Sequence, residues 1–226
     1  GEQKEEPTSG GAVQLTPLSW AELERVQPEP THWRVEGWLP ERTVTLLSAN
    51  GGVGKSNLSL QLAVSCVLGR EFIGVHTKPS RVLVISGEDE GRTVHFRVAN
   101  ICQDMGIALS DLEGKLIVYD MTQVDCVLWR NGAPTERMQW LADTVVRHKV
   151  DVVVIDNASD VFASNENDRT EVRGFKRCLN VISNTTGVAT LLLAHVDKAS
   201  VRAGAGLDSN STFSGSTAWN NSARSR

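Results

Sequence analysis

The chain has 226 residues, of which 40% are hydrophobic and 22% charged, so it can bury one sizeable core but not two. Its net charge of −4 argues against a protein that coats nucleic acid through a broad basic surface, and its four widely spaced cysteines argue against disulfides or structural zinc. Because no apolar run approaches the roughly 20 residues that span a bilayer and no signal segment opens the chain, we expect a cytoplasmic protein without a membrane partner.

Two segments precede the expected core. Residues 1–17 are rich in Glu, Gly, Ser and Thr and hold too few apolar side chains to offset the entropy lost on ordering, so we expect a flexible segment. Residues 18–40 are rich in Trp and Pro, with Ser19 as the predicted N-cap of a short helix through Arg25, and we expect this arm to pack on the core. The last residues, 223–226, end without a tail, which predicts a domain truncated at its C-terminal end.

From residue 41 onward, apolar runs of strand length alternate with helical periods. This alternation is typical of an α/β domain whose mainly parallel sheet is flanked by helices on both faces. The predicted strands are 43–48, 81–86, 115–119, 150–155 and 188–194, and the predicted helices are 55–68, 91–105, 135–148 and 170–185. After His195 the pattern stops, and the small, polar residues 199–215 predict a long flexible loop of the kind kept for function.

The predicted strand over 43–48 runs through a glycine-rich turn directly into a helical segment. Glycines let backbone N–H groups fold around phosphates at a helix N-terminus, the lysine that follows reaches the β and γ phosphates, and the next hydroxyl ligates Mg²⁺. This order of strand, loop and helix predicts a site for ATP and Mg²⁺. The residues predicted to bind nucleotide are Asn50, Gly51, Gly52, Val53, Gly54, Lys55, Ser56 and Asn57, with Ser56 also a metal ligand. The first position of the motif holds Ala49 instead of Gly, which costs little if the backbone there is not left-handed.

Three more predicted strands end in polar side chains at the same edge of the sheet. Asp156 ends one of them and would hold hydrated Mg²⁺ beside the loop serine. Glu88 follows another, where a carboxylate can activate the attacking water, whereas Asp89 and Glu90 are interpreted as acids at the N-terminus of the next helix. His195 ends the last strand and would sense the γ phosphate, with an ordinary edge histidine as the alternative.

As a set, these residues resemble the AAA-type, RecA-like ATPases related to the RepA hexameric plasmid replicative helicases. The resemblance covers about residues 33–226 and implies that 41–226 form a RecA-like P-loop ATPase domain. Its ordered motifs are Trp38-Leu39-Pro40, the phosphate loop, Gly87-Glu88-Asp89, the strand that ends at Asp156, Asn165-Glu166-Asn167-Asp168, Ala194-His195-Val196-Asp197-Lys198 and Ser214-Gly215-Ser216-Thr217-Ala218-Trp219.

The resemblance also implies roles and partners. Arg224 falls where the family keeps an arginine that reaches the ATP of the neighbouring subunit, and Arg226 is close enough to compete for that assignment. The predicted catalytic residues are therefore Glu88, Lys55, His195 and Arg224. The family implies self-association into a ring, expected to be a hexamer, with loops that touch single-stranded DNA. The cations of those loops are Arg169, Arg173, Lys198 and Arg202.

These motifs leave more than one function open. The first hypothesis is a ring-forming ATPase that translocates on single-stranded DNA as a helicase in plasmid, phage or mobile-element replication. The alternative is a regulatory or assembly ATPase that acts as a nucleotide switch on a protein partner, and both share every motif. A partition-type ATPase is rejected because that class carries a second lysine where this chain has Asn50. A small-molecule kinase fits less well, because Glu88 suits activation of water better than recognition of an acceptor.

Overall fold

The computed structural model describes residues 16–195, whose contacts divide into one unit that ends at Pro30 and a second that begins at Thr31. The first unit contains one short helix, α1 (Trp20–Leu23), and the hydroxyl of its N-cap residue Ser19 accepts from the N–H of Glu22 at 3.4 Å. The helix predicted here is confirmed, although it ends two residues early, as fraying helix ends do. The domain boundaries at residues 17 and 40 stay predictions.

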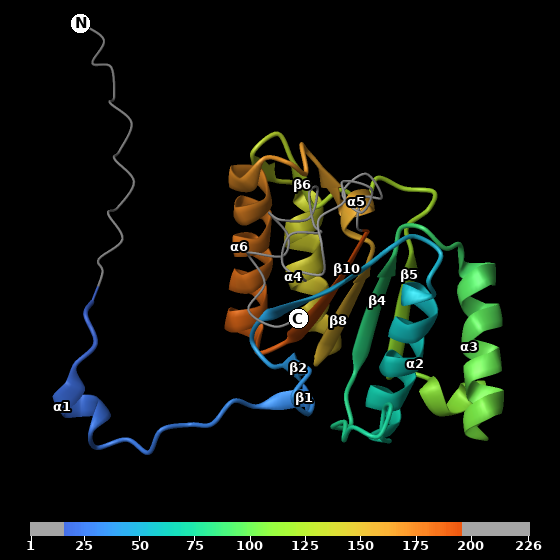
Figure 1. Ribbon diagram of the computed structural model, residues 1–226, viewed down its shortest axis with the longest axis horizontal. Coiled ribbons are helices and arrows are strands. Elements are labelled where there is room, and N and C mark those ends of the chain that lie inside the picture. The colour runs from blue at the N-terminus through green and yellow to red at the C-terminus, as the bar shows by residue number, and fades with distance from the viewer. Residues whose placement is uncertain (1–15, 196–226) are drawn as a thin grey trace, which may run out of the picture. The chain divides into compact units, whose positions relative to one another are not determined.

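The second unit is built on a five-stranded sheet (Figure 1). Its strands, in chain order, are β3 (Val44–Ala49), β4 (Val82–Ser86), β5 (Leu116–Asp120), β8 (Val152–Asp156) and β10 (Ala189–His195). Their order in space is β3, β10, β8, β4, β5, and every neighbouring pair is parallel. All five predicted strands are confirmed, and so is the α/β fold with a parallel sheet.

Four helices cover the sheet, with α2 and α3 on one face and α4 and α6 on the other (Figure 1). Their bounds are α2 (Lys55–Leu68), α3 (Gly91–Met105), α4 (Glu136–His148) and α6 (Arg169–Thr186). In β4, Val82 and Val84 belong to the core cluster of α2 and α3, whereas Leu83 and Ile85 belong to that of α4 and α6. Because both faces of the inner strands are buried, these strands are continuous apolar runs, which is why the sequence pattern revealed them.

Several short elements were not predicted. The strands β1 (Trp33–Val35) and β2 (Leu39–Pro40) pair antiparallel, and a 3-10 turn, η1 (Leu109–Leu112), leads toward β5. Val35 and Leu39 are buried in the same core cluster as α2. This hairpin therefore packs on the core of the second unit.

A second sheet, also not predicted, consists of three strands of two residues each in the order β7, β6, β9. They are β6 (Trp129–Arg130), β7 (Ala133–Pro134) and β9 (Phe162–Ala163). The short helix α5 (Ala158–Val161) leads from the end of β8 into β9. We call this three-stranded structure the small sheet.

Among residues 16–195, no helix combines the length and the apolar character that a membrane crossing requires. The predicted flexible loop over 199–215 lies outside the described residues, and so do Lys198, Arg202, Arg224 and Arg226.

Candidate functional site

The loop between β3 and α2 has the backbone of an anion-binding turn. Gly52 and Gly54 adopt left-handed φ angles of 77° and 91°, and a Cβ atom at either position would meet nothing within 4 Å. Gly54 is the N-cap of α2 and provides no side-chain cap, so the N–H groups of the first turn remain available to an anion. Ala49 lies at the end of β3 and outside the left-handed region, so alanine costs little there. The loop therefore has open space and donors for phosphate.

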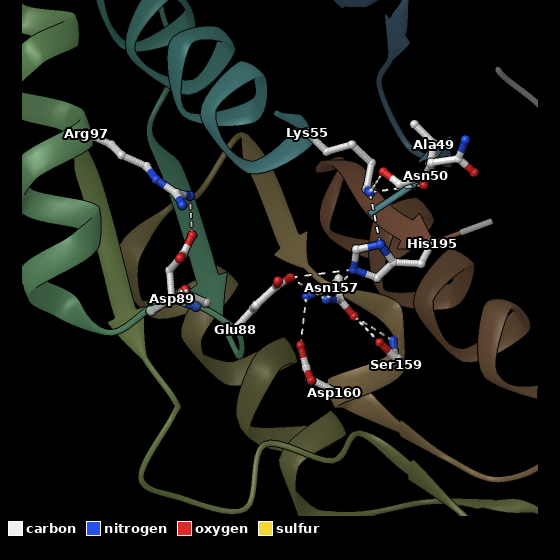
Figure 2. Close-up of polar contacts among 11 residues, drawn as sticks. Ala49, Asn50, Lys55, Glu88, Asp89, Arg97, Asn157, Ser159, Asp160 and His195 are labelled. Atoms are coloured by element: carbon white, nitrogen blue, oxygen red, sulfur yellow. Dashed lines mark hydrogen bonds and ion pairs between the residues drawn. The ribbon is translucent and has the colours of Figure 1, made fainter. Parts of the chain in front are cut away.

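Lys55 begins α2 and folds back over this loop. Its Nζ donates to the carbonyl oxygens of Ala49 and Asn50, both at 3.1 Å, and lies 3.1 Å from Nδ1 of His195 (Figure 2). The side chain is only 7% exposed, and burial lowers the pKa of Lys55 while the charges of Asp156 and Glu88 oppose that shift. The ammonium group is thus held at the loop by acceptors that phosphate oxygens can replace.

The strand order gathers the other predicted residues at the same edge of the sheet. In register, Ser86 pairs with Asp156 and His195 pairs with Ala49, and β10 separates the strand of the phosphate loop from that of Asp156. Glu88 follows β4 by two residues. Because these parallel strands end at one edge, Lys55, Glu88 and His195 converge there, as Figure 2 shows.

Asp156 and Ser56 form the part of the site that suits a divalent cation. Burial raises the pKa of Asp156, a hydrogen bond from Ser56 lowers it, and the charges of Glu88 and Asp89 raise it again. A cation beside this carboxylate would offset both burial and repulsion. Within residues 16–195 no group of three or more His, Cys, Asp or Glu side chains is arranged to hold a metal. The residues present therefore fit Mg²⁺, which prefers one or two protein ligands together with substrate phosphates and water.

Glu88 is held by a residue that the sequence analysis missed. Asn157 Nδ2 donates to Glu88 Oε2 at 2.9 Å and also lies 3.2 Å from His195 Nε2, while His195 Nε2 lies 3.5 Å from the same Glu88 oxygen. Asn157 directly follows Asp156 at the end of β8. Its position after a buried apolar strand, at the edge that carries the other polar side chains, is a signal that could have revealed it.

The acids next to Glu88 have structural roles, as their position before a helix suggested. Asp89 forms an ion pair with Arg97 of α3, and Glu90 is the N-cap of that helix. The first N–H of the helix, that of Gly91, donates to Asp120 at 2.6 Å. These contacts fix the start of α3 and with it the turn that presents Glu88.

Comparison with known families gives one assignment. A family model described as an AAA domain matches residues 11–201, which is most of the chain. Comparison with curated proteins gives no match. The matched range contains the phosphate loop and the strands that end in Asp156 and His195. The chain therefore belongs to the AAA-type ATPase family.

Proposed function

We propose that this chain binds ATP with Mg²⁺ and hydrolyses it as the motor domain of a ring-forming, RepA-like DNA helicase or translocase. The observation that carries the proposal is the meeting of Lys55 and Glu88 at one edge of the sheet, where Asp156 ends the strand beside β4 and an open glycine loop begins. Such an edge, at the carboxyl ends of parallel strands, is where open α/β sheets bind their ligands.

Each residue has a distinct proposed role. The loop residues 50–54 and Asn57 bind the phosphates through the backbone, and Lys55 exchanges its carbonyl partners for phosphate oxygens. Ser56 and Asp156 hold Mg²⁺, which neutralises phosphate charge when it is bound. His195 contacts Lys55 and Glu88, so it can sense whether phosphate has drawn the lysine away.

Glu88 is the proposed general base. Its side chain is 52% exposed, so one carboxylate oxygen can face a water molecule while Asn157 holds the other. A base that activates water favours hydrolysis over transfer to a second substrate. Arg224 is proposed to complete the site of a neighbouring subunit, which makes hydrolysis depend on assembly of the ring.

The first experiment is steady-state ATP hydrolysis, together with binding of a non-hydrolysable ATP analogue. We expect Lys55→Ala to lose binding, and Glu88→Gln to keep binding while kcat falls by about 100-fold or more. Glu113→Gln, at an exposed glutamate of the η1 turn, is the matched control. Full activity of Glu88→Gln would refute the assignment of the base. Loss of hydrolysis with Arg224→Ala but not with Arg226→Ala would support the arginine in trans.

A cationic hollow favours nucleic acid as the partner. Beside α6 lies a cavity of about 490 Å³ in which every charged lining residue is positive, although the chain as a whole is acidic. Asn180 also lines it and turns its Oδ1 to the backbone N–H of Val44, at 3.2 Å, so its amide hydrogens remain for a ligand. A surface that offers hydrogen-bond donors and no acidic side chains suits the phosphates of a nucleic acid backbone, whatever the nucleotide sequence. The charged lining residues are Arg42, Arg173, Lys176 and Arg177.

The DNA hypothesis is tested by the salt dependence of single-stranded DNA binding. Replacing Arg173 and Arg177 together with Ala should weaken binding and reduce the salt slope by about 0.7 for each phosphate that is no longer neutralised. The matched control replaces Arg92 and Arg147, which are exposed on other helices. Equal slopes for both double variants would contradict this surface, and ATP hydrolysis indifferent to DNA would favour the protein-directed switch.

A further inference from the structure

Asn157 has a side chain whose orientation is fixed from one end. It is the N-cap of α5, and its Oδ1 accepts from the N–H of Ser159 at 2.9 Å and from the Ser159 hydroxyl. Its own N–H donates to Asp160 Oδ2 at 3.4 Å, which completes a reciprocal cap. Because the side chain is only 3% exposed and its oxygen is committed to α5, the amide nitrogen must point the other way.

The amide nitrogen of Asn157 points toward Glu88, the proposed base. Both hydrogens of Nδ2 are donors, and the group lies 2.9 Å from Glu88 Oε2 and 3.2 Å from His195 Nε2 (Figure 2). An imidazole that accepts from Lys55 at Nδ1 carries its hydrogen on Nε2, so the 3.2 Å approach of Asn157 to Nε2 is not a hydrogen bond and Glu88 Oε2 is the acceptor for Asn157. Two nitrogen donors, from Asn157 and His195, therefore converge on one oxygen of Glu88.

We propose that Asn157 is a positioning residue that holds Glu88 for catalysis, an inference that rests on the proposed ATP hydrolysis. Its amide fixes Oε2, which leaves Oε1 as the oxygen directed to the attacking water. Without this hydrogen bond, the half-exposed Glu88 side chain would have to be ordered during the reaction itself, and that loss of rotamer entropy would add to the barrier. With the bond, the side chain is ordered beforehand. The Asn157 side chain thus acts as a rigid support for Glu88, because it is hydrogen-bonded both to α5 and to Glu88.

The decisive variant keeps the cap and removes the donor. Asn157→Ser retains a side-chain oxygen that caps α5 but has no N–H to reach Glu88, and Asn157→Asp caps equally well but turns a carboxylate toward it. We expect kcat to fall about tenfold for Asn157→Ser, and further for Asn157→Asp, with KM and the Kd of a non-hydrolysable ATP analogue unchanged. Asn100→Ser, at an exposed asparagine of α3, is the control.

A double-mutant cycle separates positioning from general stability. If Asn157 acts through Glu88, Asn157→Ser should lower the single-turnover rate in the wild-type background and change nothing further in the Glu88→Gln background. The same tenfold loss in both backgrounds would overturn the proposal, and so would an unchanged kcat. Thermal melting of both Asn157 variants checks that they are folded. Wild-type hydrolysis by Glu88→Gln alone would sink the proposed base itself, an outcome distinct from failure of the Asn157 inference.

Discussion

The central five-stranded sheet and the small sheet are held in different ways. In the central sheet, the inner strands β10, β8 and β4, of five to seven residues, are buried on both faces, so non-directional packing fixes them. In the small sheet, whose strands have two residues each, Trp129 and Phe162 join the core cluster of α4 and α6, and bonds from α6 add to this packing: Glu171 accepts from Trp129 Nε1 at 2.7 Å and from Gly132 N–H at 3.0 Å. The first kind of sheet spreads its stability over many side chains, whereas the second concentrates it in a few.

The two sheets also meet the site differently. The central sheet delivers Asp156 and His195 at the ends of strands, while the small sheet, through β9, continues the chain directly after α5 and its cap residue Asn157. Perturbing the small sheet therefore tests the proposed support of Glu88 as well as the fold.

The largest effect is expected in the central sheet. Leu83→Ala removes a fully buried side chain from β4 and should lower the free energy of unfolding by about 3 kcal/mol, because it leaves a cavity in the core between the sheet and the helices α4 and α6. Denaturant unfolding measures it. Leu109→Ala, at a leucine that is 43% exposed, is the control, and an equal loss there would argue against a core fixed by packing.

The next effect is expected where α6 meets the small sheet. A Cβ at Gly174 would lie 2.7 Å from the ring of Trp129, so Gly174→Ala should destabilise the protein by about 2 kcal/mol. Elsewhere inside a helix the same change stabilises by roughly 0.5–1 kcal/mol. Thermal melting distinguishes the two signs. Adding Trp129→Leu should recover part of the loss, and a stabilising Gly174→Ala would show that the ring moves aside freely.

A smaller loss is expected from Glu171→Ala, which removes the acceptor of two small-sheet donors. Leaving the N–H groups of Trp129 and Gly132 without this acceptor should cost about 1–2 kcal/mol in unfolding free energy. The control is Glu136→Ala, at an exposed first-turn position of α4. If both variants unfold at the same denaturant concentration, the small sheet does not depend on Glu171.

The smallest effect has the opposite sign and lies at the edge of the central sheet. Burial raises the pKa of Asp156 in the folded protein, so ionisation of this carboxyl group opposes folding. The free energy of unfolding is therefore highest below the usual carboxyl pKa, and it falls as pH rises through the raised pKa. Asp156→Asn should therefore raise the unfolding free energy by about 1 kcal/mol at neutral pH, with the gain vanishing in acid. Melting temperatures at neutral and acidic pH test this, and a neutral-pH loss would contradict it.

The same contrast explains what could be predicted from the sequence. The helices over 55–68 and 91–105 were predicted with the bounds of α2 and α3, because each lies between apolar strands and ends at a glycine in the left-handed conformation. The phosphate loop, Asp156 and His195 could be located because each terminates an apolar run. The small sheet could not, because two-residue strands have no periodicity and Trp129 finds Glu171 only across 42 residues of chain.

Asn157 was missed for a related reason. Its place at the end of a buried apolar strand marks it as a residue of the site, but only the fold shows that its amide meets Glu88, which lies 69 residues away in the chain. The residues around Asn157 in the sequence predict its hydrogen bond to α5, but they do not predict its hydrogen bond to Glu88.

Lys55 forms hydrogen bonds within its own loop, and these bonds bear on how strongly the loop would bind a phosphate. Because its ammonium group donates to two peptide oxygens of its own loop, an incoming phosphate replaces existing bonds, and the net affinity reflects the difference between the two sets. The loop itself would therefore compete with a bound phosphate for the lysine. Such internal competition would lower the affinity for every phosphate that Lys55 contacts, so the strength of phosphate binding would depend on the loop backbone as well as on the lysine.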